Sequence, residues 1–194
     1  MNTKQKPMKK IIASLSAVAL LMILPLLFSA CNLFDDIVKV ELPVKLEQII
    51  EVNDITTGTN KTYTQSVLLD ATANKDVNTY KDKIKDFRIN KITYVISDFV
   101  GTTGTKSSGQ IGFSQKDQTA ATVFGTITDV DLASSSAAGT SYDLALDNVG
   151  QATIATLLRD DKALKIYMSG SITKTPARFK IKVILDVTVN ANPL

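Results

Sequence analysis

The chain has 194 residues, with no histidine, no tryptophan and one cysteine. These absences exclude a Ser-His-Asp triad, a Cys-His pair and the usual zinc sites, because all of them need imidazole or thiolate groups. The formal charge of +3 comes from 22 basic and 19 acidic residues. Four of the basic residues precede Cys31 and every acidic residue follows it, so the rest of the chain has one more acid than base. We therefore predict no nucleic-acid partner.

The first 31 residues have the three parts of an export signal. Four lysines precede an apolar run over residues 11–28, and the run ends in Phe28-Ser29-Ala30-Cys31. This stretch resembles a bacterial lipoprotein signal peptide with its lipobox. The resemblance implies cleavage between Ala30 and Cys31, removal of residues 1–30 and acylation of Cys31. Two alternatives stay open, namely an uncleaved membrane helix and ordinary secretion with a free thiol.

The resemblance also implies a location. A lipidated Cys31 would hold the protein in the bacterial cell envelope, and we expect the outer membrane, on its periplasmic or surface face. Residues 31–37 then form the lipidated cysteine and a tether, and residues 38–194 form a single domain. About 160 residues are enough for one hydrophobic core.

The domain begins with alternating apolar and polar residues over 38–47, which predicts a half-buried strand. Pro43 lies within it and cannot donate to a neighbouring strand, so we place this strand at a sheet edge. Turn-forming residues over 53–62 lead to a second strand over 63–69. A short helix is expected over 74–85 with Asn74 as its cap.

Residues 87–96 change the parity of their apolar positions, which predicts a strand with a bulge near Asn90 and Lys91. The glycine-rich stretch over 101–109 is interpreted as a loop that joins this strand to residues 110–114 in a hairpin. It lacks the spacing of a phosphate-binding loop. Another strand is predicted over 123–132, followed by a mobile loop over 133–141.

A second helix is predicted from Asp147 or Asn148 to Asp160. The C-terminal region shows the clearest alternation, over residues 164–172 and 178–189, with a turn at 174–177. This pattern predicts an antiparallel hairpin at the centre of the core, with Leu185 inward and Lys182 outward.

Seven or eight strands with two short helices in the connections favour an all-β fold. We expect an antiparallel two-sheet β-sandwich of immunoglobulin-like architecture, with a β-barrel as the alternative. The Cys-Trp-Cys signature of a true immunoglobulin domain is absent.

Few residues of the sequence suggest a catalytic or metal-binding site. The three glutamates lie in the first strand region, where we interpret them as solvated charges rather than a glycosidase pair. Asp129 and Asp131 are weak candidates for a calcium site, because no further ligand follows them at a recognised interval. We predict no catalytic residue, no metal and no cofactor. The three glutamates are Glu41, Glu47 and Glu51.

The hypothesis that follows is a lipid-anchored envelope protein with a non-enzymatic binding or structural role, whose partner is an envelope protein or polysaccharide. The alternative is a carrier or sensor that holds a small apolar ligand. A carboxylate-based hydrolase is the least favoured possibility, because the common catalytic sets are missing.

Overall fold

The computed structural model describes residues 39–192, apart from the side chain of Ile55. The predicted signal peptide, the cleavage site at Ala30 and Cys31 and the tether over 31–37 lie outside the described residues. No helix between residues 39 and 192 is both long and apolar enough to cross a membrane.

Two very long strands organise the fold, β1 (Val40–Asp70) and β6 (Ala163–Ala191), which pair antiparallel along most of their length. On its other side β6 pairs with two different strands, first with β3 and then with β2. The remaining strands extend the sheet at its two ends, with β4 on β3 and β5 on β2. Their bounds are β2 (Ile84–Gly101), β3 (Lys106–Ser114), β4 (Thr122–Asp131) and β5 (Ser141–Asp143).

Both long strands bend near their middles, and each bend separates two arms. The pairing register shifts between Asp54 and Gly58 in β1. Opposite this bulge lies Thr175 of β6, whose side chain donates hydrogen bonds to the carbonyls of Thr56 and Gly58. The arms are residues 40–54 and 58–70 of β1, and residues 163–174 and 177–191 of β6.

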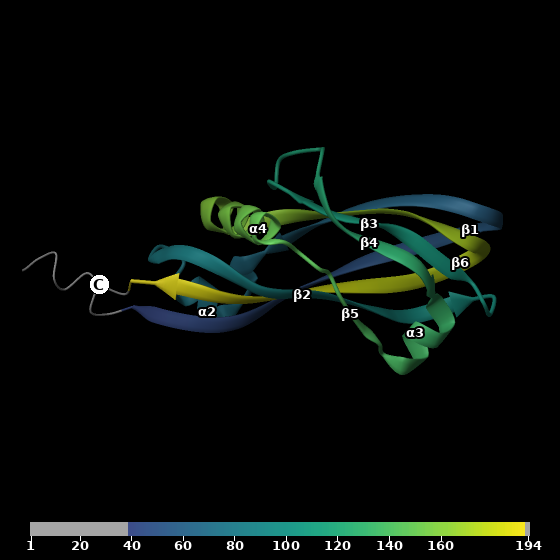
Figure 1. Ribbon diagram of the computed structural model, residues 1–194, viewed down its shortest axis with the longest axis horizontal. Helices are drawn as coiled ribbons and strands as arrows, with labels where there is room; N and C mark the ends of the chain where they lie inside the picture. The colour runs from purple at the N-terminus through teal and green to yellow at the C-terminus, as the bar shows by residue number, and fades with distance from the viewer. Residues whose placement is uncertain (1–38, 193–194) are drawn as a thin grey trace, which may run out of the picture. The chain divides into compact units, whose positions relative to one another are not determined.

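The bends fold one continuous sheet into two layers (Figure 1). The β2 layer contains the first arm of β1, the second arm of β6, β2 and β5. The β3 layer contains the second arm of β1, the first arm of β6, β3 and β4. The rings of Tyr63 in the β3 layer and Phe179 in the β2 layer meet edge to face, with centroids 6.0 Å apart. The fold is therefore an antiparallel β-sandwich, as predicted, with its layers joined through β1 and β6.

The core lies between the layers, where alternate residues of every long strand are buried. In β6 the buried positions are even-numbered before the bend and odd-numbered after it, because the bend changes the parity. These residues include Leu164, Ile166, Met168 and Ile172, then Phe179, Ile181, Val183, Leu185, Val187 and Val189.

Four helical segments connect the strands: η1 (Ala71–Ala73), α2 (Lys75–Thr79), α3 (Leu132–Ala138) and α4 (Asn148–Asp161). Asn74 caps α2 as predicted, accepting bonds from the backbone N–H groups of Asp76 and Val77. Asp147 caps α4 in the same way through Gly150. Ile154 and Leu158 anchor α4, which packs against β2 and β6.

Several strand predictions are confirmed. Val44 and Leu46 are buried, and β1 pairs only with β6 among the described strands, so Pro43 does lie on an edge. The predicted bulge in β2 is present as a register shift between Ile89 and Lys91.

Two hairpin predictions are wrong. The two arms of β6 run in opposite directions but lie in different layers, and each pairs with β1 rather than with the other arm. Likewise β2 and β3 are not paired with each other, since both pair with β6. Alternation identifies the buried face of a strand but not its neighbour, so adjacency in sequence gave the wrong partner in both places.

Two boundary predictions are also wrong. The helix expected over 74–85 ends at Thr79, since β2 already begins at Ile84. The loop expected over 133–141 contains α3, which Asp131 caps and which ends at Gly139 in the left-handed conformation (φ 59°). Its serines and alanines are typical of loops, but burial of Leu132 and Ser135 holds the segment in a helix.

Candidate functional site

The outer face of the β2 layer contains ion pairs that cross from strand to strand. Lys182 of β6 lies 3.7 Å from Glu47 of β1, and Lys91 of β2 lies 2.8 Å from Asp143 of β5. Both pairs join diagonal neighbours, because Lys182 lies opposite Ile49, two residues from Glu47, and Asp143 lies opposite Thr93, two residues from Lys91. Such neighbours point to the same side of the sheet. We call this surface the charged face. Its charged members on β1, β6 and β2 include Lys45, Glu47, Glu51, Lys91, Asp98, Arg178, Lys180 and Lys182.

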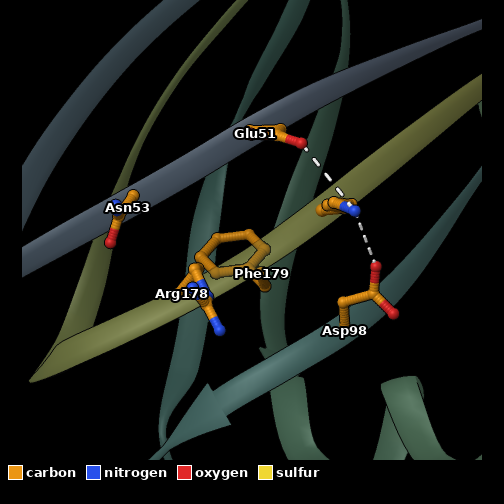
Figure 2. Close-up of a pocket in the computed structure, with 6 residues that line it drawn as sticks. Glu51, Asn53, Asp98, Arg178 and Phe179 are labelled. Atoms are coloured by element: carbon orange, nitrogen blue, oxygen red, sulfur yellow. Dashed lines mark ion pairs between the residues drawn. The ribbon is translucent and has the colours of Figure 1, made fainter.

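Close to the bend, the charged face is hollowed into an open groove of about 400 Å3. The groove is formed by β1, β6 and β2, and Figure 2 shows its lining side chains. Phe179 is fully buried, with its ring facing Tyr63 of the other layer, and the other lining residues are polar. The groove residues are Glu51, Asn53, Asp98, Arg178, Phe179 and Lys180.

Lys180 is the centre of the groove's ion pairs. Its Nζ lies 3.0 Å from the Asp98 carboxylate and 3.8 Å from that of Glu51. The hydrogen bond from Lys180 to Asp98 and the charges of Asp98 and Glu51 raise the pKa of Lys180. Lys180 is therefore protonated and paired with the Asp98 carboxylate.

The backbone places Asp98 where it meets Lys180. Asp98 has a left-handed conformation (φ 55°) within a register shift of β2 between Ser97 and Val100. Aspartate tolerates this conformation better than most residues, yet it remains an uncommon one. Such departures are frequent where a side chain must point in a particular direction for binding.

Arg178 is the second cation of the groove. It lies opposite Asn53 of β1 and Val100 of β2 in the sheet register. Arg178 and Asn53 are exposed, and Val100 has 57% of its surface accessible. Arg178 forms no ion pair with any residue between 39 and 192. Its guanidinium is thus available to an acidic group from outside the molecule.

The predicted glutamates are distributed along the first arm of β1. Glu47 pairs with Lys182, and Glu51 belongs to the groove. Glu41 is exposed opposite Asn190, farther along the strand from the groove. All three are surface charges, in accordance with the sequence interpretation.

The weak calcium candidates have other partners. The Asp129 carboxylate lies 2.7 Å from Lys106 Nζ, and the Asp131 carboxylate accepts a 2.8 Å hydrogen bond from the Ser134 N–H at the start of α3. Residues 39–192 contain no group of three or more His, Cys, Asp or Glu side chains that fits a metal ion.

The sequence did not single out Asn53, Asp98 or Arg178 as site residues. Alternation placed Arg178 on a wet face, but only the pairing of β6 with both β1 and β2 brings these three residues together. Asp98 was the hardest to find, since its orientation depends on a bulge beyond the predicted end of its strand.

A second exposed feature is the loop over 115–121 between β3 and β4, which protrudes from the β3 layer (Figure 1). Lys165 and Tyr167 hold it to β6, because Lys165 Nζ and the Tyr167 hydroxyl donate to the Gln118 carbonyl at 3.0 and 2.5 Å. A second attachment is the ion pair of Lys116 with Asp161 of α4, at 3.5 Å.

Other hollows of the described residues are also open grooves. One of about 460 Å3 lies between α4 and the start of β2 and includes Asp86 and Arg88. Another of about 460 Å3 lies between β4 and the segment over 143–145. Both open to the surface, so neither encloses an apolar ligand.

Comparisons with known proteins give only weak similarities of fold. No family model matches the chain, and no curated protein matches its sequence. One similar solved structure is that of Desmodium yellow mottle tymovirus, with a TM-score of 0.37 and 12% sequence identity. The match covers 79% of this chain and 84% of the viral chain. The decameric BFDV capsid protein has the same TM-score and identity, and the match covers 78% of this chain and 99% of the capsid chain. At these scores no functional argument follows from the similarity.

Proposed function

We propose that this is a non-enzymatic binding protein of the bacterial cell envelope, anchored through acyl chains on Cys31, whose charged face docks a partner protein. The observation that carries the docking proposal is the distribution of charge in the groove. Lys180 and Asp98 pair closely, whereas the Glu51 carboxylate lies 3.8 Å from Lys180 Nζ. Arg178 has no acidic partner among the described residues.

This distribution favours a ligand with both signs of charge. The groove contains two acids and two bases, so it has no net charge to attract a simple anion or cation. A partner that offers an acid to Arg178 and a base to Glu51 would satisfy both groups. Protein surfaces carry such pairs routinely, whereas an anionic polysaccharide would meet Glu51 and Asp98 unfavourably. Complementary charges of this kind contribute mainly to specificity and association rate.

The anchor rests on the sequence before the domain. An export signal that ends in a small residue and a cysteine gives the only cysteine of the chain a role. A domain tethered at its N-terminal side can present the charged face to a neighbouring envelope protein. The outer membrane is the location that we propose for it.

The packing of the sandwich supports this function over the carrier alternative. A carrier needs an enclosed apolar cavity of several hundred Å3. Between the two layers the inward residues of β6 are fully buried, and the grooves described above are open and partly polar. The groove on the charged face instead presents charged side chains on strands, an arrangement that suits recognition of a partner protein.

A charge exchange tests the docking proposal. In the variant Glu51→Arg with Arg178→Glu, the net charge is unchanged but the pattern is reversed. Proteins near the anchored chain are recovered by proximity labelling in a bacterial host. We expect recovery of the partner to fall about tenfold or more, which corresponds to about 1.4 kcal/mol.

The matched control exchanges another surface pair, Lys106→Asp with Asp129→Lys, which lies in the β3–β4 hairpin. This control should retain the partner. Recovery that is unaffected by the groove exchange, or that falls equally in both variants, would show that the charged face is not the docking surface.

A further inference from the structure

The outer edge of β1 is unpaired, and its two arms differ in chemistry. Among the described strands β1 pairs only with β6, so the backbone groups on its other side are free. The first arm is protected against pairing with another chain by Pro43 and by closely spaced charges. These charged residues are Glu41, Lys45, Glu47, Glu51 and Asp54.

Most of the second arm has no such protection, because its charged residues, Lys61 and Asp70, flank an uncharged segment. Residues 62–69, Thr-Tyr-Thr-Gln-Ser-Val-Leu-Leu, contain no charge, no proline and no glycine. β-branched and aromatic residues make the segment a good strand former. Its outward side chains are exposed, including Leu68 with 47% of its surface accessible. At about 3.4 Å per residue the segment offers an edge of about 27 Å.

Exposed edges of this kind are uncommon in native proteins because they template pairing with another strand. The other end strands differ in this respect. The segment over 143–145 lies beside β4 and lines the same hollow, with Leu144 against Gly125. The other end strand, β5, has only three residues. The second arm of β1 is therefore the edge best suited to strand addition.

We propose that residues 62–69 form the contact between two copies of this chain, which pair antiparallel about a two-fold axis at Ser66. The segment is complementary to itself in this register. On the outer side Ser66 meets Ser66 of the other copy and Thr64 meets Leu68. On the inner side Tyr63 meets Leu69 and Gln65 meets Val67.

No like charges oppose each other in this arrangement. Asp70 at one end meets Thr62 of the other copy, and the exposed Leu68 side chain becomes covered. Pairing of the first arm with itself centred on Ile49 would instead set Glu47 against Glu51 and oppose like charges. Self-association is thus assigned to the second arm, and it does not depend on the groove proposed above.

Disulfide trapping in the full-length, membrane-bound chain tests this contact. Residues opposite each other in an antiparallel pair have Cα atoms about 4.5 to 5.5 Å apart, which is within the reach of a disulfide. Ser66→Cys should therefore yield a covalent dimer on mild oxidation. Ser169→Cys is the matched control, because Ser169 is exposed one strand inward, opposite Thr64.

The control chain keeps Cys31, so any cross-link through that residue appears in both samples. Dimer from Ser66→Cys and none from Ser169→Cys supports the proposal, whereas equal yields or no dimer at position 66 overturns it. A second test introduces a charge at position 66 and measures sedimentation of the protein in detergent solution. Ser66→Lys and Ser66→Glu should each sediment as monomers and form dimers when mixed, and dimers that persist in either variant alone would overturn the proposed register.

Discussion

Replacement of Leu185 by alanine should be among the most damaging single changes in this domain. Leu185 lies in the second arm of β6, where its register partners are Leu46 of β1 and Ile92 of β2. All three side chains are buried, with Leu185 fully inaccessible. Alanine would leave a space in the middle of three adjacent strands, and the strands on both sides prevent the backbone from closing it.

The magnitude follows from the atoms removed. Three buried carbon groups at about 0.8 kcal/mol each give about 2.4 kcal/mol, and the remaining cavity adds to this. We expect Leu185→Ala to lower the free energy of unfolding by about 2 to 5 kcal/mol, out of about 5 to 15 for a typical domain. Urea titration followed by circular dichroism measures this directly.

Lys182→Ala is the matched control, three residues away on the opposite face of β6. Its ion pair with Glu47 spans 3.7 Å, and both side chains are more than one third exposed. Such pairs contribute little, so the change should stay within about 0.5 kcal/mol. If Leu185→Ala cost no more than Lys182→Ala, the second arm of β6 would not be the centre of the core.

Three further predictions concern the anchor, the close packing of β6 and the response to alkali. Cys31→Ala should abolish incorporation of labelled fatty acid and release the protein from the membrane pellet, because each buried acyl CH2 contributes about 0.8 kcal/mol. Retention in the pellet would instead favour an uncleaved helix. Gly170→Ala should lower the melting temperature, because a methyl group there would meet the Ser108 carbonyl and the Tyr63 ring; such overpacking costs about 1 to 3 kcal/mol. Burial, and then the neighbouring Tyr142, raise the pKa of Tyr94 from 10.0 to about 12. The unfolded chain then releases this proton first, so stability should fall between pH 10 and 12, and Tyr94→Phe should show a shallower decline in urea titrations across that range.

The sequence predicted most of the buried positions. Alternation identified Val44, Leu46, Leu185 and the inward residues of both β6 arms, because a half-buried strand repeats every second residue. It also located the bulge near Lys91, where the parity changes. The all-β sandwich follows from the number and spacing of such segments.

The alternation of apolar and polar residues did not predict which strands pair with each other. Two strands of ordinary length were expected at each end of the domain, where β1 and β6 instead run through a bend and take part in both layers. The groove depends on this arrangement, since Glu51, Asp98 and Arg178 come from three strands that are distant in sequence. Capping signals were more informative for Asn74 and Asp147 than for Asp131, whose helix consists largely of serine and alanine.

Photo-cross-linking from within the groove tests the central proposal most directly. A photoreactive amino acid replaces Asn53 in the anchored chain, and in a control it replaces Gln110, which is exposed on the outer side of the β3 layer. We expect a discrete adduct with a partner protein from position 53, absent from position 110 and lost when Arg178→Glu is added. An adduct from position 110 alone, or one from position 53 that survives Arg178→Glu, would contradict docking through the charged face.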